Sequence, residues 1–540
     1  MIRSAQGGTS PPENIQKGLL ARRIDVPCCR PAPPGHQETS TFIRRNGHFV
    51  MRSRGPIPPA VHDWCRAAFR LDLRSLALFR MVVGGIVCLD AILRTRDFRL
   101  MFAADGLFPI DALRGYHDDP SVWSLCFLSD SLAWQGVLLA AEGVAGLALS
   151  LGLFTRWACL VAWVATVSVV RRTAPAANAG DVWLVSLLFW GLFLPLGRCW
   201  SLDAVRAGRE ERGAAWAVPL VLQIASVYLA AGLSKWNASW LSGEAVVHAF
   251  SVHDHGTPLG EWFAGIPVLS SALSWSVLSL ELMGPLLLLA VPRPSVRLAL
   301  VMAFVAFHAA VACLMTVGLF APIGAAAWMA IVPGCLWDRI FGGDSAATVE
   351  PNRPATAPRV QAFFAIVAAM AWLHATGPWK ATRPPYPLTC VANLACLPQR
   401  WQMFGDVPGQ RQWVYGRAEL ADGRMVDLLR EGRPLEAGLA EAGMPGGGFF
   451  SLRHHRWHKL FWELPRPPMR VFSPSIAAAL VRDWNERHGP SEQVQWLEIR
   501  FARLPSDETS PTFHELLLAS WPDRGDRGRG NLERFLEPRE

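Results

Sequence analysis

The sequence is poor in charged residues and in tyrosine. Only 18% of its 540 residues are Asp, Glu, Lys or Arg, below the roughly 25% of ordinary soluble domains, and 51% are hydrophobic. Tyrosine occurs four times, whereas tryptophan occurs 24 times. This composition argues against an ordinary soluble protein and indicates a multi-span membrane protein with a sizeable soluble part.

Features that would indicate several other functions are missing. The net charge of +8 lies mostly in residues 1–60, whose balance is +6, and no basic stripe with interleaved aromatics follows, so we expect no nucleic-acid binding. There is no Gly-x-Ser-x-Gly motif, Walker motif or apolar signal-peptide core. Many transporters are built from internal repeats, and the sequence shows none, so a transporter lacks support.

The eleven cysteines do not form a metal ligand set, because most lie singly in or beside apolar segments. Cys390 and Cys396 differ, since they frame a short segment, Cys-Val-Ala-Asn-Leu-Ala-Cys. If that segment is exported, the two could form a disulfide, and the alternative is two unrelated thiols.

Three regions follow from composition. Residues 1–60 form a disordered basic arm, in which Met51 is a second candidate for the first residue. Residues 61–377 form an α-helical polytopic membrane bundle, and residues 378–540 form a mixed, mainly β, extracytoplasmic domain. The bundle has about nine apolar segments, at 76–93, 134–154, 157–170, 182–197, 214–234, 268–291, 296–317, 320–337 and 360–376.

The distribution of arginine predicts the orientation of the spans. The seven arginines between residues 44 and 74 precede the first segment, and further arginines follow in alternate loops, which places these loops in the cytoplasm. We therefore expect a multi-pass protein of the cell inner membrane, surrounded by lipid, with its N-terminus cytoplasmic and its C-terminal domain outside.

Local patterns predict three elements of the C-terminal domain. Asp422-Gly423 reads as the turn of a hairpin, because this dipeptide tolerates positive φ at low cost. Residues 473–488 have apolar residues at helical spacing, and residues 494–504 alternate as a strand does.

Lys235 ends the uncharged apolar segment 214–234 and is followed by Trp236 and Trp240. Burial among apolar residues disfavours the charged amine, so Lys235 at the outer membrane edge could act as a base near neutral pH. In the alternative, the lysine extends to the lipid headgroups and the tryptophans mark the interface.

Ionisable residues within the other apolar segments are candidates for function, because they are costly in a membrane. Glu281 and His308 could converge with Lys235 in a polar cavity, or they could form buried pairs that fix helix packing. The packing interpretation is favoured for Arg80, Asp90 and Glu142.

Two histidine clusters could suggest a metal, but we expect none. His248, His253, Asp254 and His255 read as a solvated interfacial loop, since no fourth anchored ligand is evident. His454 and His458 stand four residues apart beside Arg456 and Lys459, which would repel a cation, so we expect a surface patch.

An ordered set of motifs resembles a known family. These motifs are Leu73-Arg74-Ser75-Leu76-Ala77-Leu78-Phe79-Arg80, Asp105-Gly106-Leu107-Phe108-Pro109, Leu151-Gly152-Leu153-Phe154-Thr155-Arg156, Asn178-Ala179-Gly180-Asp181, Leu194-Pro195-Leu196-Gly197, Trp200-Ser201-Leu202-Asp203 and Tyr228-Leu229-Ala230-Ala231-Gly232-Leu233-Ser234-Lys235. Together, over about residues 68–340, they resemble the HTTM domain, the membrane domain shared with vitamin K-dependent gamma-carboxylases. The segment 399–404 is similar to the C-terminal part of bacterial members.

The resemblance implies a cofactor and a mechanism. Such carboxylases oxygenate a reduced naphthoquinone, vitamin K or menaquinone, and the strong base so formed removes a γ-proton from a protein glutamate, to which carbon dioxide adds. Lys235 matches the lysine that starts this cycle. His308 and Glu281 match a histidine and an acidic position of the family, and Tyr228, Trp236 and Trp240 would border the quinone.

One departure from the family leaves two hypotheses. Animal carboxylases carry a histidine where this chain reads Asn178-Ala179-Gly180-Asp181, and an ionised aspartate cannot donate a hydrogen bond. The first hypothesis is a hydroquinone-dependent, carboxylase-like enzyme with Lys235 as base. The second is a non-catalytic membrane protein that binds quinone, lipid or partner helices.

Overall fold

The computed structural model describes residues 59–117, 119–252, 255–342, 386–397, 401–405, 412–435, 454–503 and 514–522, with a few single positions between them. The expected basic arm therefore lies outside the described residues, except for its last two positions. The expected ninth span, 360–376, also lies outside them, apart from isolated positions. The described residues belong to one compact unit.

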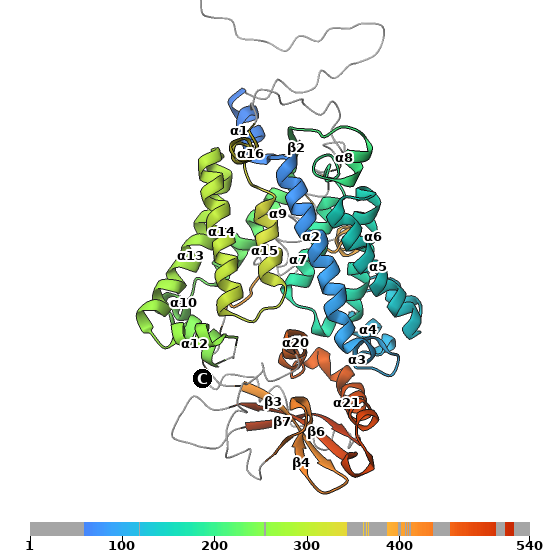
Figure 1. The fold of residues 1–540 in the computed structure, drawn as a ribbon. Helices are drawn as coiled ribbons and strands as arrows, with labels where there is room; N and C mark the ends of the chain where they lie inside the picture. Colours follow the sequence, from blue (N-terminus) through green and yellow to red (C-terminus); the bar gives the residue numbers. More distant parts are fainter. Residues whose placement is uncertain are drawn as a thin grey trace, which may run out of the picture. The chain divides into compact units, whose positions relative to one another are not determined.

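In the described part of the chain, four helical segments are long and apolar enough to cross a membrane: Leu73–Phe102, Leu132–Leu151, Pro267–Ala290 and Pro294–Leu314. They contain α2 (Leu73–Arg94), α5 (Leu132–Leu151), α13 (Pro267–Ala290) and α14 (Pro294–Leu314), shown in Figure 1. A fifth span could form from α15 (Phe320–Met329) and α16 (Gly334–Phe341), which are bent by 83° at a short break.

The structure thus does not establish the nine spans expected from the sequence. Two of the expected segments form short helices, α7 (Ala179–Gly191) and α9 (Val218–Ser234). A third forms α6 (Thr155–Arg172), which carries one arginine near its start and two at its end. The segment 214–234 begins as a strand rather than a helix, so its helical part has only 17 residues.

Short elements connect the long helices. They are α1 (Pro59–Phe69), η1 (Thr95–Asp97), α3 (Phe98–Phe102), α4 (Ile110–His117), η2 (Leu125–Leu128), η3 (Ala174–Ala176), α8 (Leu202–Arg206), α10 (Ala238–Ser242), α11 (Glu244–Val247), the π-helical turn η4 (His248–Val252), α12 (Pro258–Ala264) and α18 (Tyr386–Leu394). The strands β1 (Arg70–Asp72) and β2 (Ala214–Trp216) pair antiparallel just before α2 and α9 begin.

Close packing of small residues joins α2 and α5. A Cβ on Gly84 would lie 2.4 Å from Ser150 N, and a Cβ on Gly146 would lie 2.7 Å from Cys88 N. Only glycine permits this approach of two helix backbones, which is the way membrane helices commonly pack without a hydrophobic driving force.

The C-terminal domain is built on a five-stranded antiparallel sheet in the order β5-β4-β3-β6-β7. Its strands and remaining elements are β3 (Gln412–Leu420), β4 (Met425–Asp427), η7 (Leu428–Arg430), β5 (Arg433–Pro434), α20 (His455–Glu463), η9 (Pro467–Phe472), α21 (Ser473–Arg487), η10 (Pro490–Glu492), β6 (Val494–Arg503) and β7 (His514–Trp521). The predicted helix at 473–488 and strand at 494–504 are confirmed as α21 and β6. The predicted turn is also confirmed, with Gly423 at a φ of 83° between β3 and β4.

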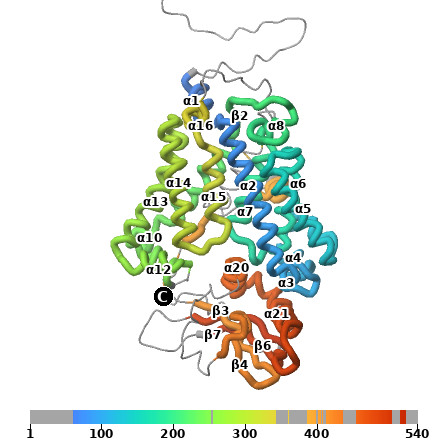
Figure 2. The backbone as a smooth tube through the Cα atoms, in the orientation of Figure 1, coloured from blue at the N-terminus to red at the C-terminus, as the bar shows by residue number. Residues whose placement is uncertain are grey.

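One apolar core continues from this domain into the segment after α2. Phe108 packs edge-on against Phe472, and Leu100, Phe102 and Leu107 share a buried cluster with the sheet and α21. Figure 2 shows α3 and α4 next to α21, which packs on the sheet. The sheet is therefore docked at the end of α2 that is remote from α1 and α16.

Candidate functional site

Lys235 ends α9, and its side chain turns back into the bundle. The helix stops there because Asn237 begins α10 as its N-cap, with its side chain accepting from Trp240 N. Lys235 Nζ lies 2.9 Å from Oε2 and 3.2 Å from Oε1 of Glu281 on α13. Both side chains are only 6% exposed, so the two groups form a buried ion pair.

The depth of this pair within the bundle follows from the lengths of the two helices. Glu281 lies in the interior of the 24-residue α13, which continues beyond the end of the 17-residue α9. The short helices α10, α11 and α12 fill the space that the difference in length leaves. The amine therefore contacts the middle of a long apolar helix, because neighbouring helices of the bundle differ in length.

A second polar pair lies two turns before Lys235 on α9. Tyr228 Oη lies 2.5 Å from Nε2 of His308 on α14, and both side chains are buried. His308 fits because α15 carries Gly324 at this point, where a Cβ would lie 2.1 Å from the imidazole. Residues i and i+7 share one face of a helix, so α9 presents Tyr228 and Lys235 to the same side.

That side borders a cavity with an empty volume of about 930 Å³, its mouth included. Tyr228, Lys235 and Glu281 supply polar groups to its wall, which is otherwise mostly aliphatic and aromatic. The apolar part comes from α9, α10, α11, η4, α13, α14, the start of α15 with the segment before it, and the C-terminal domain, and includes Phe250, Val277, Phe307, Leu314 and Trp401. An apolar pocket with few convergent polar groups is typical of a small-molecule site.

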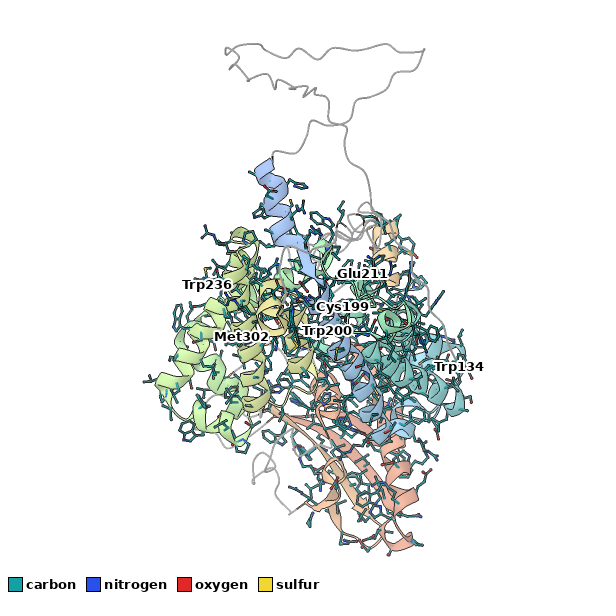
Figure 3. All side chains as sticks on the ribbon, turned by 45° about the horizontal axis from the view of Figure 1, so that its top comes forward. Trp134, Cys199, Trp200, Glu211, Trp236 and Met302 are labelled. Atoms are coloured by element: carbon teal, nitrogen blue, oxygen red, sulfur yellow. The ribbon has the colours of Figure 1, made fainter. Side chains whose placement is uncertain are left out.

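The two tryptophans expected beside the lysine lie in different environments. Trp240 lines the cavity, its ring centroid is 5.4 Å from Lys235 Nζ, and its Nε1 donates to Phe404 O. Trp236 is 60% exposed at the outer face of the bundle (Figure 3). The structure thus brings Tyr228, Lys235, Trp240 and Glu281 to one cavity, with His308 behind Tyr228, and leaves Trp236 outside.

One wall of the cavity was missed by the sequence analysis. Trp401, Met403 and Phe404, which precede the sheet of the C-terminal domain, line the cavity opposite the helices. Asn237 Nδ2 donates to Gly405 O over 2.6 Å and holds this segment against the end of α9. The aromatic run 401–404 stood out in the sequence, but no spacing rule links it to a helix more than 160 residues earlier.

Asp181, at the position compared with the histidine of animal carboxylases, serves two other contacts. Its Oδ2 accepts from Asn178 N, and Asn178 Oδ1 accepts from Asp181 N, so the two form a capping box at the start of α7. The same carboxylate is ion-paired with Arg94 and Arg456.

The expected surface patch at His454 and His458 is wrong. These residues belong to the start of α20, which buries Arg456, Trp457 and His458. His454 Nε2 lies 2.5 Å from Asp97 Oδ2, and Trp457 Nε1 donates to the same oxygen. The polar side chains are accommodated because η1 and α2 supply carboxylates that the sequence did not place nearby.

Among the described residues, the remaining candidate groups form neither a metal site nor a disulfide. His253 and Asp254 lie outside the described residues, and His248 Nδ1 contacts Val407 O. No group of three or more metal-ligating residues occurs within the described ranges. Cys390 and Cys396 are free thiols, so the disulfide alternative is not formed in this structure.

Comparison with known proteins identifies the membrane part. Residues 70–333 match the family model of the HTTM domain, and this part of the chain contains the Lys235–Glu281 and Tyr228–His308 pairs. The match supports an HTTM-domain protein of the membrane. No match was found among curated proteins or among solved structures.

Proposed function

We propose that the protein is a membrane enzyme that uses a reduced naphthoquinone, vitamin K or menaquinone, with Lys235 as the proton-accepting base. The observation that carries the proposal is the buried Lys235–Glu281 pair at the wall of a large apolar cavity. The resemblance to the membrane domain of vitamin K-dependent carboxylases supports the choice of chemistry. When bound, the reduced quinone would supply the oxygen-dependent strong base of a carboxylase or epoxidase.

The residues of the cavity fit such a cofactor. A flat aromatic ring with an apolar tail matches a wall of aromatic and aliphatic side chains. Its two oxygens need polar partners, and Lys235, Glu281 and Tyr228 offer them within one apolar cavity. Trp401 and Phe404 would exclude water from the side of the C-terminal domain.

Proton transfer within the ion pair would prepare the base. If one proton moves from Lys235 Nζ to Glu281 Oε2 over 2.9 Å, the ammonium and carboxylate become an amine and a carboxylic acid. This neutral pair costs less to keep from water than two ions. The free amine can then accept a proton from a hydroxyl beside it.

Tyr228 would orient the cofactor. With its proton on Nε2, His308 donates to Tyr228 Oη, and the tyrosine O–H is then free to donate into the cavity. His308 thus acts through Tyr228 and does not itself need to reach the cofactor.

We also propose the orientation given by the arginine distribution, with about nine spans in the inner membrane when the shorter helices are included. The start of α20 and helix α21 of the C-terminal domain contact Asp97, Arg99 and Asp105, which follow α2, so this domain lies at the opposite end from Arg74. This position supports a cytoplasmic N-terminus and an extracytoplasmic C-terminal domain if α2 is the first span. A protein glutamate is then the proposed acceptor on that outer side.

A second candidate function is binding of quinone, lipid or partner helices without turnover. It is favoured by Asp181, because this residue is ion-paired and caps a helix where animal carboxylases carry a histidine. The cavity and the lysine pair favour the enzyme.

Formation of a quinone epoxide tests the proposal. The full chain in lipid nanodiscs is incubated with reduced menaquinone, oxygen and bicarbonate, and epoxide is measured by mass spectrometry. We expect epoxide from the native protein and from Lys459→Met, which removes a different glutamate-paired ammonium on α20, but not from Lys235→Met. Equal epoxide from both variants would remove Lys235 from the mechanism, and none from the native protein would leave the binding function.

A further inference from the structure

We propose that Arg456 is a positioning residue that ties the start of α7, and through it one wall of the cavity, to the C-terminal domain. The tie itself follows from contacts between described residues. Its effect on naphthoquinone binding rests on the proposed function.

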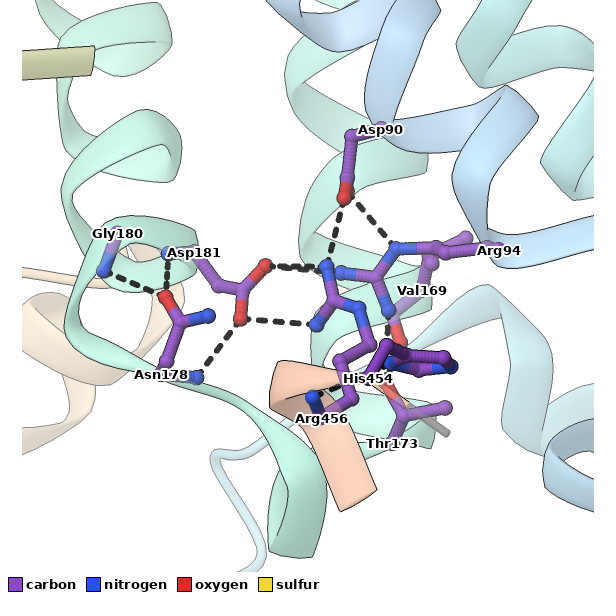
Figure 4. A network of polar contacts seen from close by, with 9 residues as sticks. All are labelled: Asp90, Arg94, Val169, Thr173, Asn178, Gly180, Asp181, His454 and Arg456. Atoms are coloured by element: carbon purple, nitrogen blue, oxygen red, sulfur yellow. Dashed lines mark hydrogen bonds and ion pairs between the residues drawn. The ribbon is translucent and has the colours of Figure 1, made fainter. Parts of the chain in front are cut away.

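Arg456 joins a network of four buried charges, two arginines and two aspartates (Figure 4). Its Nη2 donates to Asp90 Oδ1 over 2.6 Å and to Asp181 Oδ1 over 2.9 Å, and its Nη1 donates to Asp181 Oδ2 over 3.0 Å. Arg94 donates to the other oxygen of Asp90 and again to Asp181. We call these four residues the interlock; its charges sum to zero.

The interlock joins three segments that are remote in the sequence. Asp90 and Arg94 belong to α2, Asp181 to α7 and Arg456 to α20, which lies 275 residues beyond Asp181. Burial lowers the pKa of Arg456, but Asp181 and Asp90 raise it above its ordinary value, so the arginine stays charged. The four hydrogen-bonded charges sum to zero and form a stable buried network. Removal of any one of them would leave an uncompensated buried charge and destabilise the fold.

The start of α7 continues into the cavity wall. Trp183, one turn after the capping residue Asn178, is fully buried, and its ring centroid lies 5.7 Å from Tyr228 and 5.5 Å from Trp401, both of which line the cavity. A Cβ on Gly180 would lie 3.1 Å from Phe320 Cα, and Phe320 also lines the cavity. A shift of α7 would therefore displace the residues behind Tyr228.

Hydrogen–deuterium exchange tests the tie without any ligand. In the full chain in nanodiscs, we expect the amides of residues 180–183 to exchange roughly tenfold faster in Arg456→Met than in the native protein. The matched control is Arg482→Met, since Arg482 also pairs with an aspartate of the membrane part, Asp105, but this pair is exposed and does not contact α7. Exchange in the control should equal that of the native protein.

A second variant separates positioning from failure to fold. Arg456→Met with Asp90→Asn leaves Arg94 and Asp181 as one neutral pair, so we expect most of the stability to return while exchange at 180–183 stays fast. Native exchange in this folded double variant would overturn the proposal.

Binding of 2-methyl-1,4-naphthoquinone, followed by tryptophan fluorescence, distinguishes the two proposals. We expect the Kd of the double variant to be weaker by roughly tenfold. A native Kd together with fast exchange would overturn the claim that α7 shapes the cavity. If the native protein does not bind the probe, the proposed function is wrong. The hydrogen–deuterium exchange experiment then still tests whether Arg456 ties α7 to the C-terminal domain.

Discussion

The molecule contains two buried groups of opposite charges, and they differ in how completely they are satisfied. In the interlock, each carboxylate oxygen of Asp90 and Asp181 accepts at least one hydrogen bond from a guanidinium. Between α9 and α13, both oxygens of Glu281 face one ammonium, and the pair borders an apolar cavity. The hydrogen bonds of the interlock are complete, so we expect this network to stay fixed. The Lys235–Glu281 pair borders a cavity and can rearrange when a ligand enters.

This difference separates structural from functional charge in a membrane protein. A closed network of hydrogen-bonded charges fixes helices, because any loss leaves an unpaired charge in an apolar surrounding. A single pair at a cavity wall can exchange a partner for a ligand or move a proton. Both groups of charges are buried, so burial alone does not tell a structural group from a functional one. The presence of a cavity beside the group distinguishes them better.

The largest effect on stability is expected at the interlock. Arg456→Met leaves one uncompensated buried carboxylate and should lower the free energy of unfolding by about 3–5 kcal/mol, as breaking a buried pair commonly does. Denaturant unfolding of the nanodisc or detergent-solubilised protein measures this. Loss of less than about 1 kcal/mol would show that water reaches the site and that the comparison with the cavity pair is wrong.

Glu281→Gln tests the cavity pair by its chemistry. The amide cannot take the proton of Lys235, so the proposed epoxide formation should fall by about 100-fold, a usual contribution of acid–base groups. Glu463→Gln is the matched control, because Glu463 is the partner of Lys459 outside the cavity. An unchanged rate in Glu281→Gln would mean that Lys235 loses its proton by another route.

Gly324→Ala tests whether His308 holds Tyr228. The added methyl group would lie 2.1 Å from the imidazole, so His308 must move and its contact with Tyr228 is lost. Such overpacking costs about 1–3 kcal/mol in unfolding experiments. Gly85→Ala on α2, where nothing lies within 4 Å of the new Cβ, should cost nothing, and equal losses in both would contradict the proposed role of His308.

The last effect concerns the pH dependence of stability at α20. Burial, followed by the charge of Arg456, lowers the pKa of His455 to about 4, so the unfolded chain binds a proton between about pH 6.5 and 4 that the folded protein does not. Stability from this group is complete above pH 6.5 and falls with pH below it, by at most about 1.4 kcal/mol per unit. His455→Gln should flatten this part of the unfolding profile, and His62→Gln, at an exposed position, should not.

The sequence predicted the chemistry of the cavity better than its shape. Ionisable residues in apolar helices are costly and need partners, so residue type and position were enough to make Lys235, Glu281 and His308 candidates. Their separation in sequence gave no register between α9, α13 and α14, so neither the depth of Lys235 nor the contact of His308 with Tyr228 could be read from it. By their positions in the sequence, Trp236 and Trp240 were equal candidates for the wall of the cavity. Only the folded structure shows that Trp240 lines the cavity and that Trp236 does not.

Elements with a local pattern were predicted well, and contacts between domains were not. The turn at Asp422-Gly423, α21 and β6 depend on neighbouring residues, and the structure has all three. Arg456 and the histidines around it looked like a solvated patch because their partners, Asp90, Asp97 and Asp181, lie more than 270 residues away. The number of spans is subject to a similar limit, since an apolar run predicts burial but not whether lipid or protein surrounds it.

The aromatic segment before the sheet gives the cavity one face that does not belong to the membrane helices. Met403 and Phe404 lie on irregular backbone, where substitutions disturb helix packing least, whereas Trp401 is buried against Trp183 of α7. We therefore expect the choice of ligand to be adjustable there, by replacing a few loop residues while the bundle stays intact. A fragment ending at residue 342 would retain Lys235 but lack the segment 401–404, so its cavity would be open on that side. Tests of ligand selectivity therefore need the whole chain.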